Sequence, residues 1–157
     1  VMVLGLYTGQ RRSDLCVMRW SDISGGGVRV VQQKTGTKVR IPVHPELARH
    51  LEEWRPNTRT LTILANSLGR PWRPNALTAA YGKQCAALNM QGATIHGLRK
   101  TAAAKLAEAG CSAKQIMAIT GHASLEEVER YTREAEQDIL AGAAISAFPT
   151  IKLGGGL

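Results

Sequence analysis

Two β-type segments lie next to each other in a chain that is otherwise patterned like helices, and they limit the folds open to it. The runs VRVVQQK and KVRIPV are rich in valine and isoleucine and meet around Thr35 and Gly36, which predicts a β-hairpin. Glycines, prolines and capping residues divide most of the remaining chain into helical segments. The sequence therefore predicts a mainly α fold with a small antiparallel β-sheet, of the α+β class.

The expected helices are separated by turns. We expect them over residues 1–7, 13–18, 45–54 and 73–89, and from 97 almost to the end. Pro45 suits a first helical turn, and Asn75 is a candidate N-cap. Nearer the end, Ser124 and Glu127 match an S-x-x-E capping box, which predicts the start of a short helix.

The composition is that of one globular domain with a polyanionic partner. The chain has 157 residues, of which 44% are hydrophobic and 20% charged, and this excludes a disordered protein. Aromatic residues make up only 4%, so aliphatic side chains and alanine must fill the core. The net charge of +8 and the pI near 9.9 favour a partner such as nucleic acid.

The cysteines and the apolar start of the chain indicate its setting. Three cysteines lie far apart and form no C-x-x-C pair, which argues against disulfides or a zinc site and favours a reducing compartment. The opening VMVLGLY reaches Thr8 and Gly9 too soon for a membrane span, and no basic segment or cleavage signal accompanies it. We expect a soluble protein, and a fragment that begins inside a buried helix.

Two arginines lie where a phosphate group is easily bound. TGQRRSDL places Arg11 just after a glycine turn, with Asp14 three residues later and within reach on a helix. HGLRK places His96 and Arg99 at i and i+3, so both can face one point at a helix N-terminus, where anions are favoured. Taken singly, these patterns are more typical of a surface arginine paired with an aspartate and of an ordinary solvated helix face.

Three more residues are candidates on similar terms. Lys34 ends a strand beside a tight turn, where a solvated lysine is the default. His122 follows Gly121, an arrangement typical of a histidine at a helix C-cap. Tyr131 comes nine residues after His122, beyond a break in the helix. It is either a packing residue or a nucleophile that a turn brings to the histidine.

These motifs occur in a fixed order: T-G-x-R-x-x-D-L, then K-T in a hairpin, then H-x-L-R, then G-H with a tyrosine nine residues on. In this order they resemble the catalytic domain of the tyrosine recombinases, also called phage integrases. The resemblance runs from Leu4 to about Thr132, and LCVMRWSDI, IPVHPEL and TAAAKLAEAG agree with it. Each motif alone is weak, but together and in register they are highly specific.

The resemblance implies site-specific cleavage and rejoining of DNA, with strand exchange through a covalent 3′-phosphotyrosine on Tyr131. The chemistry of the residues agrees, because negative charge builds on the phosphate oxygens during the attack. The planar guanidinium groups of Arg11 and Arg99 each suit two oxygens at once. His96 and His122 each add a donor, and one of them also handles the nucleophile's proton.

Two residues complete the expected site. Lys34 is the expected general acid, because the leaving 5′-oxygen of deoxyribose is a strongly basic alkoxide that needs a proton. Asp14 is expected to hold Arg11 and the histidines in place rather than to touch DNA. The sequence has no phosphate-binding G-x-x-x-x-G-K-[ST] loop and no paired carboxylates, so we expect neither ATP, nor a metal ion, nor another cofactor.

The sequence departs from the family pattern at three points. The leucine that usually precedes G-H is Thr120 here, which we interpret as a packing change. The acid after Arg11 is Asp14 rather than the commoner glutamate, which has a longer reach. Third, we expect residues 1–157 to correspond to the catalytic domain without the N-terminal DNA-clamping domain typical of the family, and therefore to bind DNA weakly.

Two other functions share these features. One is a DNA-binding domain of the same fold that has lost catalysis, although every expected residue is present. The other is a type IB topoisomerase, which shares the chemistry but relaxes supercoils without pairing two sites. H-G-L-R, and G-H-A-S followed by R-Y, favour the bacterial or phage recombinase form.

The resemblance also implies partners. We expect double-stranded DNA, a homo-oligomer (a tetramer) on DNA, no membrane, and a bacterial or phage-encoded protein in the cytoplasm at the nucleoid. We expect residues 135–148 to form a C-terminal helix that Pro149 stops. Its apolar stripe must be buried, either on its own domain or, as in proteins it resembles, on a neighbouring protomer. The stripe consists of Ile139, Leu140, Ala143, Ala144, Ala147 and Phe148.

Overall fold

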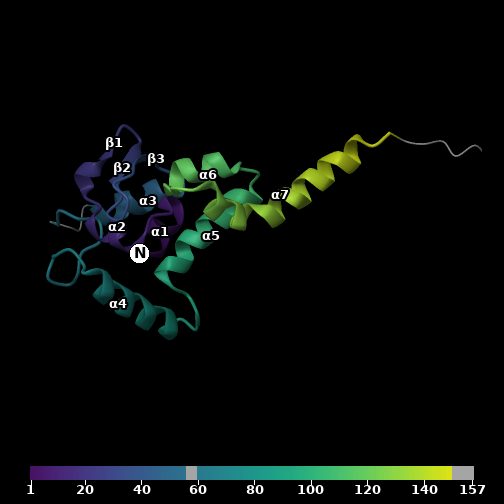
Figure 1. Ribbon diagram of the computed structural model, residues 1–157. Helices are drawn as coiled ribbons and strands as arrows, with labels where there is room; N and C mark the ends of the chain where they lie inside the picture. The colour runs from purple at the N-terminus through teal and green to yellow at the C-terminus, as the bar shows by residue number, and fades with distance from the viewer. Residues whose placement is uncertain (56–59, 150–157) are drawn as a thin grey trace, which may run out of the picture.

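Helices pack against a small antiparallel sheet, and one long helix projects away from them (Figure 1). The computed structural model describes residues 1–55 and 60–149. Within these ranges the elements are α1 (Met2–Thr8), α2 (Arg12–Val17), the 3-10 turn η1 (Trp20–Asp22), β1 (Ile23–Ser24), β2 (Gly27–Val31), β3 (Lys38–Pro42), α3 (Pro45–Trp54), α4 (Pro74–Ala87), α5 (Ile95–Glu108), α6 (Ala113–Thr120) and α7 (Leu125–Ala147).

The predicted β-hairpin is present as β2 and β3. The two strands pair antiparallel, with Val28 opposite Ile41 and Arg29 opposite Arg40. Val28 and Ile41 are buried and the two arginines are exposed, which is the alternation expected of a strand with one covered face. A third strand, β1, adds Ile23 opposite Val28, but its two residues are too few to leave a sequence pattern. The mainly α fold with a small antiparallel sheet is confirmed.

The helix starts follow their capping chemistry, with one correction. α3 begins at Pro45 as expected, after His44, whose ring nitrogen accepts from the backbone of Glu46 at 3.2 Å. Asn75 is not the N-cap of α4, and that prediction is wrong. Pro74 occupies the first turn of α4, so the N-cap is the residue before it, Arg73.

The helix that follows Ser124 is longer than the sequence indicates. Ser124 Oγ accepts from the backbone N–H of Glu127 at 3.3 Å, so the serine half of the capping box is present. The helix then continues for 23 residues, through the segment expected to be a separate C-terminal helix. Tyr131 therefore lies near the start of one continuous α7.

Two apolar clusters hold the body together. The larger one surrounds α1 and joins it to α2, the sheet, α3 and α4, with Leu4, Leu15 and Leu47 fully buried. The smaller one joins α5, α6 and the beginning of α7. Its buried members are Ala103, Ala107, Ile116 and Val128, and Tyr131 packs against them. The smaller cluster thus fixes the part of α7 that carries the tyrosine.

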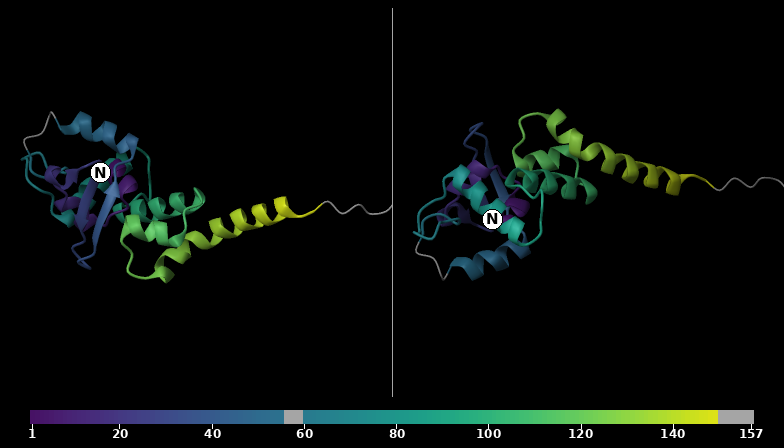
Figure 2. Two further views of the ribbon diagram at one scale, coloured as in Figure 1. Left: turned by 90° about the horizontal axis from the view of Figure 1, so that it is seen from above. Right: turned by 90° about the horizontal axis from the view of Figure 1, so that it is seen from below.

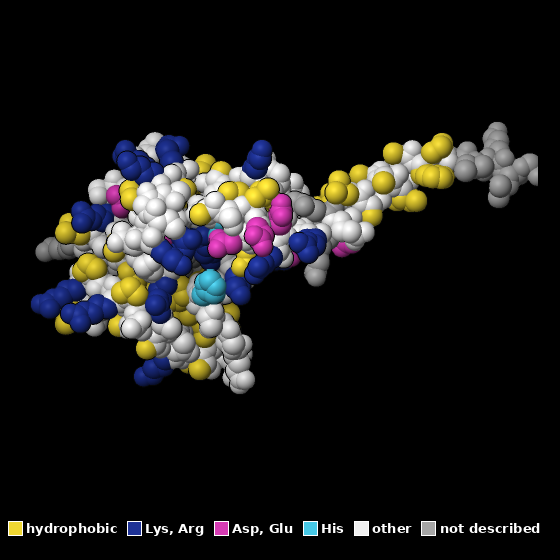
Figure 3. All heavy atoms as spheres, in the orientation of Figure 1, with side chains coloured by type: hydrophobic (Ala, Val, Ile, Leu, Met, Phe, Trp, Pro, Cys, Tyr) yellow, Lys and Arg dark blue, Asp and Glu magenta, His cyan; other side chains and the backbone are white. Residues whose placement is uncertain are grey.

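The outer half of α7, residues 137–147, projects away from the rest of the domain (Figure 1). Figures 1 and 2 show it extending away in every view, and Figure 3 shows mostly hydrophobic side chains along it. The exposed fractions are 68% for Leu140, 71% for Ile145 and 63% for Phe148. The apolar stripe expected to be buried is therefore uncovered in the single chain. No helix in the described ranges is long and apolar enough to cross a membrane.

Candidate active site

Three of the predicted residues, each from a different motif, line one cavity. Arg11 is the N-cap of α2, Lys34 lies in the turn between β2 and β3, and His96 lies in the first turn of α5. The cavity measures about 480 Å³. It is also lined by Arg12, Ser13, Thr78, Thr94 and Ile95. Figure 3 shows Lys and Arg side chains gathered around a histidine on the body of the protein. The fold therefore concentrates positive charge around a hollow.

Arg11 is held by a neutral partner. Its side chain is half-buried, and Nη1 donates to Oε1 of Gln32 at 2.6 Å. An amide oxygen orients a guanidinium group without cancelling its charge, as a carboxylate would. Arg11 therefore keeps its positive charge available for an anion in the cavity.

Arg99 is the more deeply buried arginine, with 3% of its surface exposed. Its Nη1 donates to the main-chain oxygens of Gly9 at 2.8 Å and Thr120 at 2.5 Å. Burial, and next the positive charge of Arg11, lower the pKa of Arg99 to about 10, so it stays protonated at pH 7. Its Nη2 is buried without a hydrogen-bond partner among the described residues. This unused donor suits an oxygen of a bound phosphate.

A turn brings the histidine and the tyrosine together. Gly121 ends α6 in the left-handed conformation, with φ of 67°, and the chain reverses there. The ring centroids of His122 and Tyr131 are 6.3 Å apart, and the planes are inclined by 33°. The Nδ1 atom of His122 lies 2.7 Å from the hydroxyl of Thr120. Tyr131 is thus both a packing residue of the small cluster and a neighbour of the histidine.

The environment of His122 keeps it neutral. Burial, followed by the charge of Arg99, lowers the pKa of His122 to about 4. Arg11 and His96 lower the pKa of His122 further, whereas Glu127 raises it. Hydrogen bonds link the cavity to the histidine and tyrosine beyond it, because Gln32, which holds Arg11, and Arg99 both donate to Thr120 O, and the Thr120 hydroxyl contacts His122. We therefore treat the two groups of residues as one candidate site.

Lys34 and His96 are more open than the arginines. Both side chains are exposed. Lys34 lies at the tip of the hairpin, and His96 follows Thr94, whose hydroxyl caps α5 by accepting from Gly97 N at 2.9 Å. Neither position fixes the functional nitrogen in the way that main-chain bonds fix Arg99.

Asp14 has a different partner from the one expected. It is fully buried, and its Oδ1 accepts from the backbone N–H of Gln33 at 2.7 Å. Its Oδ2 has no hydrogen-bond partner among the described residues. Asp14 therefore holds the base of the hairpin turn next to Lys34, while Gln32 holds Arg11. The carboxylate of Asp14 also raises the pKa of Arg99, which opposes the larger effects of burial and of Arg11.

The sequence model described as the Phage integrase family matches residues 1–138. The chain belongs to the phage integrase family. The integrase of Escherichia phage HK022 is 32% identical over 141 residues, covering 83% of this chain and 39% of that protein. Tyrosine recombinase XerC of Mycobacterium bovis (strain BCG / Pasteur 1173P2) is 31% identical over 138 residues, covering 82% and 46%. This phage integrase family chain therefore spans less than half the length of these relatives.

Solved structures agree with the fold. A lambda integrase(75-356) dimer bound to a COC′ core site matches with a TM-score of 0.69 and 31% identity, covering 79% of this chain and 49% of that one. A lambda integrase tetramer bound to a Holliday junction matches with a TM-score of 0.65 and 32% identity, covering 78% and 40%. XerA recombinase, at 20% identity and a TM-score of 0.78 over 90% and 56%, shares the fold.

Three residues of this integrase-family site were not found from the sequence. Gln10 and Gln32 are buried and bond to each other, and Gln32 also bonds to Arg11, but glutamines in a turn and a hairpin carry no signal of that role. Thr120 was interpreted as a packing change. Its hydroxyl instead donates to Ile116 O at 2.7 Å and contacts His122, which a leucine cannot do. That part of the interpretation is wrong.

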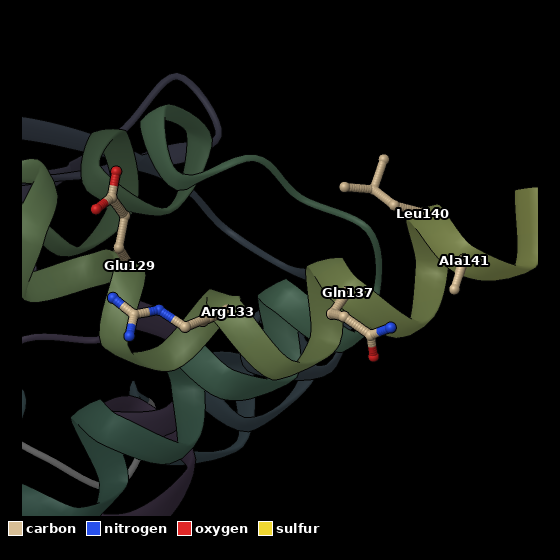
Figure 4. Close-up of a pocket in the computed structure, with 5 residues that line it drawn as sticks. All are labelled: Glu129, Arg133, Gln137, Leu140 and Ala141. Carbon is tan, nitrogen blue, oxygen red and sulfur yellow. The ribbon is translucent and has the colours of Figure 1, made fainter. Parts of the chain in front are cut away.

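A second hollow, of about 510 Å³, lies away from these residues. Figure 4 shows its lining side chains along a single stretch of α7. They are Glu129, Arg133, Gln137, Leu140 and Ala141. Groups from one helix do not converge on a reacting atom, so this hollow is not the active site of the integrase-family chain. Among the described residues no group of three or more His, Cys, Asp or Glu is placed to hold a metal ion.

Proposed function

We propose that this chain cuts and rejoins double-stranded DNA at a specific site through a covalent 3′-phosphotyrosine on Tyr131. One observation carries the proposal. Arg99, a buried arginine with an unused donor, shares the main-chain oxygen of Thr120 with Gln32, which holds Arg11. The hydroxyl of the same Thr120 contacts His122, which lies beside Tyr131. Such a cluster suits a phosphodiester under attack by a phenol, because it offers fixed positive charge next to a nucleophile.

The two arginines stabilise the charge that develops on phosphorus. Arg11 and Arg99 contribute planar guanidinium groups, which bind two oxygens at once. Both are fixed before DNA arrives, Arg11 by Gln32 and Arg99 by main-chain oxygens. Fixed donors cost no reorganisation when the transition state forms. The exposed His96 adds a further donor at the mouth of the cavity.

The nucleophile must lose a proton, and His122 is placed to take part. Without DNA it is neutral, because burial and the arginines lower its pKa to about 4. A bound phosphate brings negative charge, which offsets the arginines and raises the pKa of His122 again. The histidine is then able to accept a proton as Tyr131 attacks phosphorus. The Tyr131 oxygen forms the new P–O bond while the bond to the 5′-oxygen breaks.

The leaving 5′-oxygen needs a proton, and Lys34 supplies it in this mechanism. The ammonium group sits on an exposed hairpin turn that borders the cavity. A flexible side chain on such a turn is able to follow the leaving oxygen as it moves away from phosphorus. Rejoining runs the same steps backwards, and the energy of the broken bond is kept in the phosphotyrosine. The mechanism therefore needs neither ATP nor a metal ion.

The partners follow from the relatives. The similar lambda integrase structures are a dimer on a core site and a tetramer on a Holliday junction. We therefore propose that this chain works as a tetramer on DNA, in the cytoplasm of a bacterial host and at the nucleoid, as the domain of a longer phage-encoded or bacterial protein. The uncovered stripe on the outer half of α7 supports docking on a neighbouring protomer in that assembly.

A trapping experiment tests the reaction. The chain is mixed, in excess EDTA, with a pool of randomised duplexes nicked so that the cleaved strand loses a short fragment and cannot rejoin. We expect a covalent adduct on a denaturing gel, with the DNA on Tyr131 by peptide mapping. Tyr131→Phe should abolish the adduct and leave DNA affinity almost unchanged, because only the nucleophilic oxygen is removed.

Tyr7→Phe is the matched control, because Tyr7 stacks on His44 outside the site and should leave the adduct intact. DNA binding without any adduct would favour a catalytically silent DNA-binding domain. An adduct that persists in Tyr131→Phe would move the nucleophile elsewhere. Activity that EDTA abolishes and magnesium restores would contradict a site built from side chains alone. Strand exchange that needs no second DNA site would favour a type IB topoisomerase.

A further inference from the structure

A buried pair of glutamines lies behind Arg11. Gln10 is 0% exposed and Gln32 is 1% exposed. Gln32 Nε2 donates to Gln10 Oε1 at 2.8 Å and to Thr120 O at 2.7 Å. Gln32 Oε1 accepts from Arg11 Nη1 at 2.6 Å and from Thr35 Oγ1 at 3.1 Å. A side-chain amide has two donors and two acceptor sites, so every one of them is used.

The partners fix the orientation of this amide. Thr120 O can only accept and Arg11 can only donate, so nitrogen and oxygen of Gln32 cannot exchange places. Gln10 is fixed in the same way, because its Nε2 donates to Thr8 O at 2.8 Å and to Ile119 O at 2.9 Å. Hydrogen bonds to main-chain oxygens of α1 and α6 therefore hold Gln32 Oε1, the acceptor for Arg11, in a fixed position.

The backbone of Gln32 makes the hydrogen bonds that close the hairpin turn on the Lys34 side of the cavity. Its N–H donates to Thr37 O at 2.9 Å, and its carbonyl oxygen accepts from Gly36 N at 2.8 Å. These bonds close the turn that carries Lys34. A single residue thus fastens Arg11 through its side chain and the lysine turn through its main chain.

We propose that Gln32 is a positioning residue, which orients Arg11 and ties it to the Lys34 turn and to the end of α6. A neutral amide suits this task better than a carboxylate of the same shape. Glutamate would pair with the charge of Arg11 and would turn an oxygen towards Thr120 O and Gln10 Oε1, which are already acceptors. Arg11 would then be held but partly neutralised.

Gly121 supports this assignment. A Cβ atom at Gly121 would lie 2.5 Å from Gln32 Nε2, so only glycine allows the amide to reach Thr120 O. The same glycine has φ of 67°, which lets the chain reverse towards His122. The position of Gln32 and the turn that delivers the histidine therefore depend on one another.

The inference rests on the proposed function, and cleavage assays test it. The variant Gln32→Met is compared with Arg11→Ala, and Gln33→Met is the matched control. The substrate is a nicked duplex whose sequence is taken from the DNA that forms an adduct with the wild-type protein. Gln33 has an exposed side chain on the same hairpin. Each variant is assayed with a normal scissile phosphate and with an uncharged methylphosphonate. The neutral linkage has no anionic charge for Arg11 to balance, so defects that act through Arg11 should shrink on it.

We expect Gln32→Met to slow cleavage of the phosphate substrate by about 10-fold, which is less than the ~10²-fold loss expected when a direct donor is removed. On the methylphosphonate substrate the same variant should be slowed by under about 3-fold. Gln33→Met should match wild type on both. Equal losses on the two linkages would make Gln32 a purely structural residue, and no loss would show that Arg11 does not need it. If Gln32→Met does not fold, Gln32→Glu replaces it and should show the same split.

A measurement without DNA separates this inference from the proposed function. Titration with inorganic phosphate, followed by the guanidinium resonance of Arg11, should show several-fold weaker binding in Gln32→Met than in Gln33→Met. Equal binding overturns the positioning role whether or not DNA is cleaved. Wild-type protein that binds phosphate normally but gives no adduct would instead overturn the proposed function.

Discussion

Arg99 and Tyr131 belong to the same candidate site but are held by different forces. Arg99 is almost fully buried and donates to two main-chain oxygens. Tyr131 is half-buried and packs on the small apolar cluster between α5, α6 and α7. Hydrogen bonds impose a direction, whereas apolar contact does not. In the proposed mechanism the group that stabilises charge is therefore set in advance, whereas the nucleophile is positioned by the packing of its helix.

The same contrast divides α7 itself. In its first turns Val128 and Thr132 are fully buried. In its outer half Leu140 and Ile145 are 68% and 71% exposed. Tyr131 lies in the packed first half of the helix, close to the start of the exposed half. Whatever covers the outer half is thus able to act on the tyrosine through a continuous helix.

The loosely held groups should show the largest kinetic effect. Lys34→Ala should slow cleavage of normal DNA by about 10²- to 10⁴-fold, the usual contribution of a general acid. A substrate with sulfur at the bridging 5′ position should largely restore the rate, because a thiolate leaves without being protonated. Single-turnover cleavage of both substrates measures this.

Lys38→Ala is the control, since Lys38 is exposed on β3 of the same hairpin. It should behave as wild type on both substrates. A Lys34→Ala defect that sulfur does not rescue would give the lysine another task, such as binding in the minor groove. The acid would then be His96 or His122.

Replacing the fixed arginines with lysine should show that the planar geometry of the guanidinium group matters as well as its charge. Arg11→Lys and Arg99→Lys should each lower the cleavage rate on the order of 10²-fold or more, because an ammonium cannot bridge two oxygens as a guanidinium does. Arg29→Lys, on the exposed face of β2, serves as the control for the substitution itself. Near-normal cleavage by either site variant would reduce that arginine to an anchor for the phosphate.

The division between bonded and packed groups also explains what the sequence could predict. The hairpin, the helix at Pro45 and the ordered motifs of the site follow from local chemistry or from a resemblance, and the hairpin and helix were found where expected. The proximity of His122 and Tyr131 required the turn at Gly121, which the sequence marked only as a break.

The partners of the site residues were not predictable in this way. Gln32 reaches Thr120 across 88 positions, and nothing in either local sequence indicates the pairing. Asp14 was expected to pair with Arg11 from its i+3 spacing, yet it bonds to the backbone at Gln33. Local spacing gives the candidates that are within reach. The burial of each side chain decides which of them is used.

The buried histidine should make stability depend on pH. The pKa of His122 is about 4 in the folded chain against an ordinary 6.5, so below pH 6.5 the unfolded chain binds the proton more readily. Its contribution is complete above pH 6.5 and is lost as the pH falls towards 4. With allowance for its partial exposure, we expect a loss of about 1–2 kcal/mol. Urea unfolding between pH 7 and 4 measures this loss of stability. In His122→Gln, the part of the pH dependence of the unfolding free energy that comes from His122 should disappear. An unchanged slope would mean that the histidine is not buried as neutral imidazole.

The outer half of α7 should matter least for stability and most for assembly. Deleting residues 137–157 removes side chains that, where described, are exposed, so the free energy of unfolding should change by less than about 1 kcal/mol. Binding to a single DNA site should persist, whereas multimers on DNA should weaken in sedimentation or gel-shift assays. A full-length variant with Leu140→Gln and Phe148→Gln keeps the helix but removes the ends of the stripe, and it should reproduce the assembly defect. Unfolding or aggregation of the truncated monomer would instead place the stripe in the core of its own domain and rule out docking on a neighbour.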